Sequence, residues 1–140
     1  MKKLLVLVFF FCFQRLAAQD DFVMLGSGGG FAGTATVYKI CSNGQVFKGK
    51  GLGEVTYREK SKIGRSTAKK FFKEVKAHVT TVLDFNHPGN QYYFIGLSEK
   101  RITSRITWGD TEHPMDKEVE KLYQEMTSAI TPLTFVPVKK

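Results

Sequence analysis

The spacing of apolar residues switches between strand-like and helix-like periods along the chain, and this switching constrains the fold more than any other feature. Segments rich in Val, Ile, Thr and aromatic residues lie within positions 22–58 and 91–108. Apolar residues recur three or four positions apart over Ser66–Val82 and again after Pro114. The order is therefore three strands, a helix, two strands and a second helix. Strands grouped in hairpins with helices between them predict an α+β fold.

The hairpins are the best-defined part of this order. Asn43-Gly44 is a strong hairpin signal, and it joins a strand over Thr34–Cys41 to a partner over Gln45–Lys48. Gln91–Leu97 and Ile102–Trp108 form a second antiparallel pair. We therefore expect one antiparallel sheet of about five strands, with two helices packed on one face.

Each predicted helix has one apolar face. The first helix carries lysines on its other face, which indicates a solvated face; docking on a membrane surface or an acidic partner is the alternative. Ser66 is expected to cap its N-terminus. The second helix is expected to begin near Pro114 and to end at Pro132. The tail, Leu133–Val138, contains Pro137 and is expected to be an edge strand or a loosely docked arm.

The N-terminal segment has the pattern of a secretory signal peptide. Lys2 and Lys3 precede an apolar run over Leu4–Phe13, which is too short to span a bilayer. Leu16-Ala17-Ala18 offers a small residue at the cleavage position, so we expect residues 1–18 to be removed. A buried N-terminal helix or an uncleaved anchor is the alternative. The predicted protein is exported, either to the periplasm or out of the cell, and keeps no transmembrane segment after cleavage.

Composition narrows the classes of function. The chain is 42% hydrophobic and 24% charged, which is typical of a globular protein. We expect one domain over residues 19–130 and a tail over 131–140. The formal net charge is +8, but Lys and Arg are scattered along the sequence, so we expect no nucleic-acid partner. Cys41 alone of the cysteines remains after cleavage, and burial is favoured over intermolecular pairing.

A glycine-rich segment follows the first predicted strand, Phe22–Leu25. It runs from Gly26 to Gly33 and contains one aromatic residue, Phe31. It opens a strand and lacks the Lys-Ser/Thr ending of a phosphate-binding loop, which argues against nucleotide binding. Two interpretations remain. The segment is either a structural bulge or wide turn, or a recognition loop that projects its aromatic residue toward a partner.

The residues Ser27-Gly28-Gly29-Gly30-Phe31-Ala32-Gly33 resemble the Ser-Gly-Gly-Phe-Ala-Gly segment near the start of emfourin-type proteins. These are small bacterial inhibitors of thermolysin-like metallopeptidases such as protealysin. A similar order of elements extends the likeness over Phe22–Ile130. The resemblance implies an inhibitor without catalytic activity that docks its loop into or across a protease cleft. The partner-binding residues it implies are Gly28, Gly29, Gly30, Phe31 and Gly33.

Two segments share an Asp-x-x-His spacing. Asp84 and His87 precede the second predicted hairpin, and Asp110 and His113 follow it, so both segments lie at its open end. Two carboxylates and two imidazoles are a feasible ligand set for zinc or another divalent ion. The alternative is that these are turn and helix-start residues, with Asp110 capping the second helix. We favour the alternative and expect no metal and no cofactor.

Recognised catalytic motifs are absent from the sequence, which has neither His-Glu-x-x-His nor Gly-x-Ser-x-Gly. His78 lies among apolar residues of the first helix, where a half-buried packing role is expected. We predict a non-enzymatic protein-binding domain, with metallopeptidase inhibition as its specific form. A structural or envelope-associated domain is the alternative, and it predicts a buried Phe31. A metal-dependent enzyme would bring all four Asp and His candidates to one point.

Overall fold

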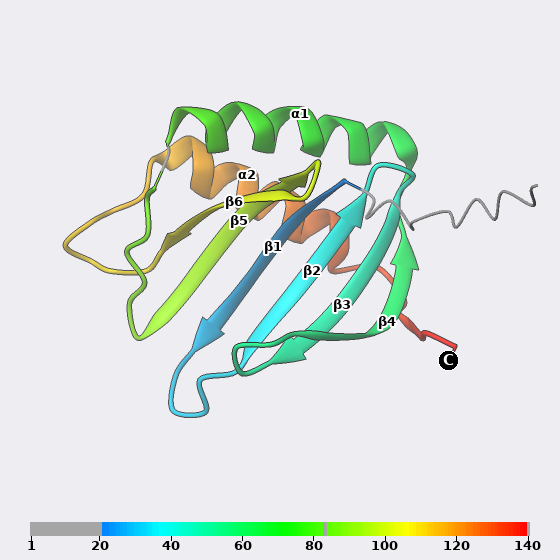
Figure 1. Ribbon diagram of the computed structural model, residues 1–140, viewed down its shortest axis with the longest axis horizontal. Helices are drawn as coiled ribbons and strands as arrows, with labels where there is room; N and C mark the ends of the chain where they lie inside the picture. Colours follow the sequence, from blue (N-terminus) through cyan, green and yellow to red (C-terminus); the bar gives the residue numbers. More distant parts are fainter. Residues whose placement is uncertain (1–20, 83, 140) are drawn as a thin grey trace, which may run out of the picture.

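A single antiparallel sheet, with the first strand inside it, organises the molecule (Figure 1). The computed structural model describes residues 21–82 and 84–139, so the expected signal peptide lies outside the described residues. The strand order is β6-β5-β1-β2-β3-β4-β7. Together with two helices, this sheet confirms the predicted α+β class. The elements are β1 (Phe22–Gly29), β2 (Ala35–Cys41), β3 (Gln45–Gly51), β4 (Thr56–Lys62), α1 (Arg65–Thr81), β5 (Gln91–Glu99), β6 (Ile102–Trp108), α2 (Lys117–Ile130) and β7 (Val136–Pro137).

The sheet has seven strands, so the expectation of about five was wrong. β4 was not counted among the predicted strands, because none of its residues is buried and its apolar pattern is therefore weak. Its strand conformation comes from backbone pairing with β3. β7 is a short edge strand, in which Val136 lies opposite Lys60 and Pro137 opposite Glu59. The tail is therefore the edge strand that was one of its two expected forms. An edge tolerates proline, which has no N–H to donate to a further strand.

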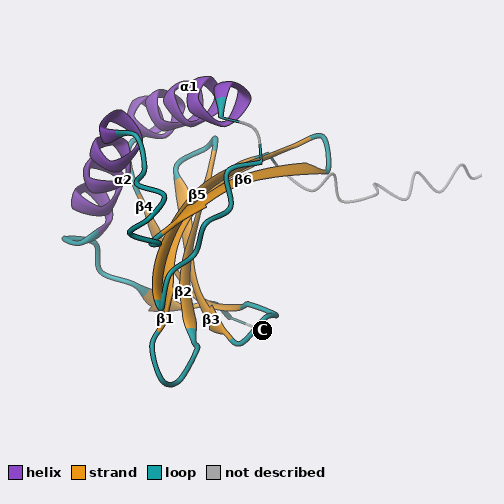
Figure 2. Cartoon of the chain, turned by 90° about the vertical axis from the view of Figure 1, so that its left-hand side faces the viewer, coloured by secondary structure: helices purple, strands orange, loops and turns teal. Residues whose placement is uncertain are grey.

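The packing of the helices differs from the expectation that both would pack on one face of the sheet in the same way. The two helices contact different sets of strands. α1 contacts β1, β5 and β6, whereas α2 contacts β1 and also packs against α1 (Figure 2). Both helices and the sheet share one core. Its most buried members include Val23, Leu25, Ile40, Val46, Ala68, Val75, Ile95, Ile106, Val119 and Met126. Within the described residues, no helix has the length and apolar character needed to cross a membrane.

The helix starts also differ from the sequence prediction. The N-cap of α1 is Gly64, which offers no side-chain cap, so the prediction of Ser66 was wrong. α2 begins after Pro114, at Lys117. Asp116 caps it by accepting a hydrogen bond from the backbone N of Glu118 at 2.7 Å. Asp110 is therefore not the cap. The mistake arose because Ser and Asp are common both at caps and in the neighbouring turns.

On the sheet face opposite the core, two aromatic rings are covered by cationic side chains of the sheet itself. Gly26 leaves room on β1 for the ring of Phe94. A Cβ on Gly26 would lie only 2.6 Å from Cζ of Phe94, too close for a normal contact. The Arg105 guanidinium carbon lies 3.7 Å from the centroid of the same ring. Lys39 covers Phe22 in the same way, with its Nζ 3.9 Å from the ring centroid. As a result Phe94 is 1% exposed although it lies outside the helix-covered core.

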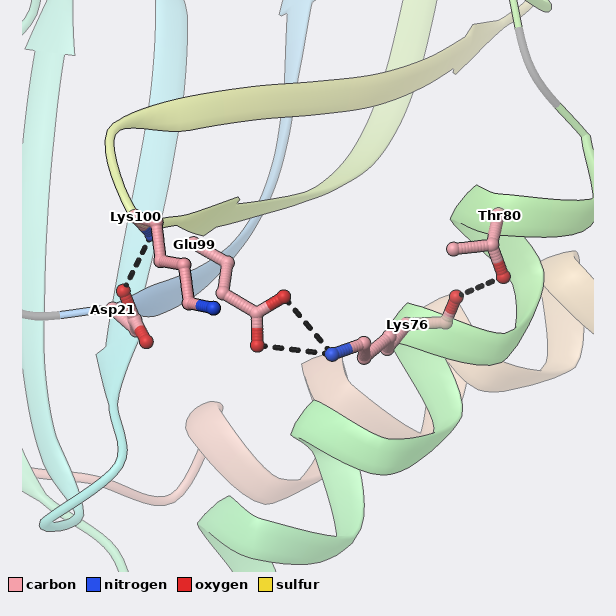
Figure 3. Close-up of polar contacts among 5 residues, drawn as sticks. All are labelled: Asp21, Lys76, Thr80, Glu99 and Lys100. Atoms are coloured by element: carbon pink, nitrogen blue, oxygen red, sulfur yellow. Dashed lines mark hydrogen bonds and ion pairs between the residues drawn. The ribbon is translucent and has the colours of Figure 1, made fainter.

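The β5–β6 hairpin is tied to α1 and to the start of β1 (Figure 3). Lys76 on α1 donates to both carboxylate oxygens of Glu99, at 3.0 and 2.9 Å. The backbone N of Lys100 donates to Asp21 at 2.9 Å. Lys100 and Arg101 form the turn with φ of +51° and +68°. This left-handed conformation is costly for residues with a Cβ, so the turn is a weak point of the hairpin.

We expect Arg101→Gly to raise the free energy of unfolding by about 0.5–1 kcal/mol, because glycine adopts positive φ without steric cost. Urea denaturation followed by circular dichroism measures the change. Lys60→Gly is the control. Lys60 lies on β4 and does not have a positive φ, so glycine there brings only its entropic cost and should lower the free energy of unfolding. A loss of stability in Arg101→Gly would contradict the strain at this turn.

Candidate binding loop and histidine cluster

The glycine-rich segment divides into a strand part and a loop part. β1 was expected to end at Leu25, but it continues to Gly29, with Gly28 opposite Tyr92 and Gly29 opposite Gln91. The ring of Tyr92 occupies the space that a Cβ on Gly28 would need. Gly28 and Gly29 therefore belong to the sheet, and the projecting loop is 30–34.

The loop is a tight turn with a defined backbone. The N–H of Gly30 donates to the carbonyl oxygen of Asn90 at 2.8 Å, which anchors the loop to the chain before β5. The N–H of Gly33 donates to the carbonyl of Gly30 at 3.2 Å, which places Phe31 and Ala32 at the corners of the turn. Gly30 and Gly33 have φ of +73° and +64°, values that favour glycine. The sequence thus specifies a turn that holds Phe31 outward.

Phe31 and Leu52 are exposed apolar side chains on two neighbouring turns, and together we call them the apolar tip. Their exposed fractions are 112% and 71%. Leu52 lies in the turn between β3 and β4, and its Cδ2 is 3.3 Å from the place of a Cβ on Gly33. The two turns are therefore neighbours at the same end of the sheet (Figure 1). Leu52 was not predicted from the sequence, although an apolar residue between Gly51 and Gly53 was a usable signal.

Basic side chains gather on the strands that lead to the turn of Leu52. Lys50 on β3 and Arg58 on β4 are exposed and line a shallow depression. Lys48 lines it as well, with its Nζ 3.7 Å from a carboxylate oxygen of Glu59. With three cations and one carboxylate among its lining residues, this surface is positively charged and suits a partner that carries acidic groups.

The structure brings together three of the four predicted Asp and His residues. Ligand atoms of His87, Asp110 and His113 all lie within 4.8 Å of one another. The two imidazole rings stack, with centroids 4.0 Å apart and planes 10° apart. Nδ1 of His113 lies 2.7 Å from Oδ2 of Asp110. Asp84 is not in this group; it is exposed in the turn after α1, with φ of +63°.

Backbone hydrogen bonds and a close glycine contact fix the segments that carry this cluster. The N–H of His87 donates to the carbonyl of Thr107 at 2.9 Å, and the N–H of Asp110 donates to the carbonyl of His87 at 3.0 Å. A Cβ on Gly109 would lie 2.9 Å from the Cα of Tyr92 and 3.0 Å from the N of Gly89. Glycine at position 109, where φ is +147°, therefore permits the two segments to meet.

Hydrogen bonding favours the ionised form of the Asp110 carboxyl. The backbone N–H of Glu112, which donates to it at 3.0 Å, lowers the pKa of Asp110 most, and the hydrogen bond with His113 lowers it further. The cluster thus holds a carboxylate against one imidazole and a second imidazole stacked on the first.

Other residues singled out from the sequence have structural surroundings. Cys41 is buried on β2, as favoured. His78 is half-buried on α1, as expected. The lysines of α1 lie on its exposed side, where Lys70 and Lys76 pair with Glu125 and Glu99, which agrees with a solvated face.

Compared with models of known protein families, the chain matches none, and no curated protein matches it. The resemblance to emfourin-type proteins therefore stays a prediction carried by the residues Ser27–Gly33.

We expect Gly109→Ala to lower the free energy of unfolding by about 2–4 kcal/mol, because the added methyl group meets backbone atoms on two segments. Gly53→Ala is the control: φ there is also positive, at +81°, but nothing lies within 4 Å of the added Cβ. Its cost should stay near 1 kcal/mol. Equal losses in the two variants, measured by chemical denaturation, would show that the backbone contact at Gly109 adds nothing.

Proposed function

We propose that the protein is an exported, non-enzymatic domain that binds a protein partner through the apolar tip. The observation that carries this proposal is the full exposure of Phe31. An aromatic side chain held outward by a glycine turn contributes little to the core, and exposed apolar groups gathered at one place are typical of interaction sites. The alternative, a purely structural domain shaped by its glycines, predicts a buried Phe31 and is therefore less well supported.

The loop has the properties of a preorganised anchor. Two backbone hydrogen bonds, at Gly30 and Gly33, hold the turn before any partner arrives, so little conformational entropy is lost on binding. A Phe ring entering an apolar pocket is a common hot-spot contact, and truncation of such a contact typically costs about 2 kcal/mol or more. Leu52 extends the apolar contact beside it. Lys50 and Arg58 favour a partner with carboxylates near that pocket.

Inhibition of a metallopeptidase is the specific form of this proposal. It rests on the resemblance of Ser27–Gly33 to the emfourin loop, and export by the predicted signal peptide would bring the protein to secreted proteases. A projecting turn with one aromatic anchor suits insertion into or across an enzyme cleft. In this form the protein would bind a thermolysin-like enzyme and carry out no chemistry itself.

A protease assay tests the function directly. The protein beginning at Gln19 is incubated with a thermolysin-like protease, and cleavage of a small peptide substrate is followed. We expect stoichiometric inhibition, weakened at least tenfold by Phe31→Ala. Ile102→Ala is the matched control, because Ile102 is 72% exposed but is the first residue of β6, next to the β5–β6 turn and away from the apolar tip.

The outcomes separate the parts of the proposal. No inhibition at a large excess of protein would remove the inhibitor form. Inhibition that Phe31→Ala leaves intact would remove the apolar tip as the contact, whatever the partner.

The stability of the same variant tests the structural alternative. We expect Phe31→Ala to change the free energy of unfolding by less than about 0.5 kcal/mol, because the ring is exposed. Phe94→Ala, which removes a ring that is 1% exposed, should lower it by about 3–5 kcal/mol. Denaturant titration measures both. A loss above about 2 kcal/mol in Phe31→Ala would favour the structural domain.

A further inference from the structure

The cluster of His87, Asp110 and His113 has no part in the proposed binding function, and it carries a second site. We propose that His87 and His113, positioned by Asp110, bind a divalent transition-metal ion, with zinc as the ion that best suits the donors. This inference does not rest on the proposed binding function. Its basis is that two segments separated by a whole hairpin bring their imidazoles together at the hairpin's open end.

The donor chemistry selects the class of ion. Imidazole nitrogen suits zinc, copper and nickel, whereas magnesium and calcium take oxygen ligands. His87 and Asp110 are half-buried and His113 is exposed, so an ion can reach the cluster from solvent. Two imidazoles leave further positions on the ion for water or for a ligand from another molecule.

The hydrogen bond from His113 decides which of its nitrogens can bind a metal. An ionised carboxylate has no hydrogen to give, so Nδ1 of His113 donates to Oδ2 of Asp110 across the 2.7 Å contact. In the neutral ring this leaves the lone pair on Nε2. A carboxylate that fixes the tautomer and orientation of a metal-binding histidine is a frequent arrangement. Asp110 is therefore a positioning residue for His113 as well as a source of negative charge.

The stacked rings need a small adjustment to share one ion. Tetrahedral zinc at roughly 2.0–2.1 Å from each nitrogen holds its two nitrogens about 3.4 Å apart. One ring nitrogen of each histidine already lies within 4.8 Å of one ring nitrogen of the other, so rotation of the two rings can bring a pair of nitrogens to this separation. The backbone at His87 and Asp110 is held by hydrogen bonds, so the side chains alone have to move.

A purely structural stack is the competing explanation. Phe85 packs edge-on against His87, with centroids 4.8 Å apart, and His87 stacks on His113, so the three rings hold the segments together without any ion. The variants His87→Phe and His113→Phe separate the two explanations, because each keeps an aromatic ring in the stack and removes the nitrogens.

Zinc binding to the purified protein without a histidine tag tests the site. Competition with a chromophoric chelator measures the affinity, and Mg²⁺ serves as the oxygen-preferring control ion. We expect one zinc per chain, at least tenfold weaker binding in His87→Phe and in His113→Phe, and a loss of about tenfold in Asp110→Asn. His78→Phe is the matched control: this third histidine lies on α1, and its loss should leave the affinity unchanged.

Nuclear magnetic resonance of the imidazole groups gives a second readout. Zinc should shift the ring signals of His87 and His113 and leave those of His78 in place. The proposal is overturned if the wild-type protein binds no zinc, or if the two Phe variants bind it as the wild type does. Circular dichroism confirms that each variant is folded before its affinity is compared.

Discussion

The pairing of β1 with β5 is the contact on which both candidate sites depend. The ladder runs from Phe22 opposite Ser98 to Gly29 opposite Gln91, so the end of β1 lies beside the start of β5. The turn that carries Phe31 begins where this ladder ends, and the segment that carries His87 arrives at the same place. A slip of one residue in this register would turn the side chains of β1 to the opposite face of the sheet. The buried alternation of Val23 and Leu25 prevents such a slip.

Glycine supports the two sites through different physical effects. At Gly30 and Gly33 it supplies positive φ, which makes a tight turn and leaves Phe31 outside. At Gly109 the absence of a Cβ also matters, because backbone atoms of Gly89 and Tyr92 occupy the nearby space. A side chain at Gly28 would instead meet the ring of Tyr92. Composition alone does not distinguish these cases, since the distinction lies in what each residue faces across the sheet.

The parts of the fold that were predictable from the sequence are those with strong local patterns. The helical spacing that includes Val75 and Leu122 gave the buried faces of both helices, and Asn43-Gly44 gave the hairpin between β2 and β3. β4 was not predicted, because its residues are not deeply buried and its strand conformation comes from pairing with β3 and β7. The extension of β1 to Gly29 escaped because glycine has low strand propensity, which the packing of rings from β5 overrides here.

The candidate sites were predictable to different depths for a related reason. The Asp-x-x-His segments that flank the β5–β6 hairpin were enough to predict that His87 and His113 lie at the same end of it. Antiparallel pairing fixes where the segments on either side of a hairpin meet. It was not enough to place Asp84, whose left-handed turn conformation depends on how α1 ends. Leu52 was not predicted as a neighbour of Phe31, because β4 and therefore the β3–β4 turn that carries Leu52 were not predicted; the pairing of β2 with β3 brings that turn beside the loop of Phe31.

The apolar tip and the histidine cluster are both held by the backbone of Gly89 and Asn90, which we call their shared support. This determines whether a substitution at one site also affects the other. The carbonyl of Asn90 accepts the hydrogen bond from Gly30, and the adjacent Gly89 contacts Gly109, which precedes the cluster residue Asp110. A substitution that alters a side chain at the apolar tip or in the histidine cluster leaves this support in place, so its effect stays local. A Cβ added at Gly109 acts on the support itself and should disturb the cluster and the base of the Phe31 turn together. Binding by the tip and binding by the histidines are therefore separable by side-chain changes and coupled by backbone changes.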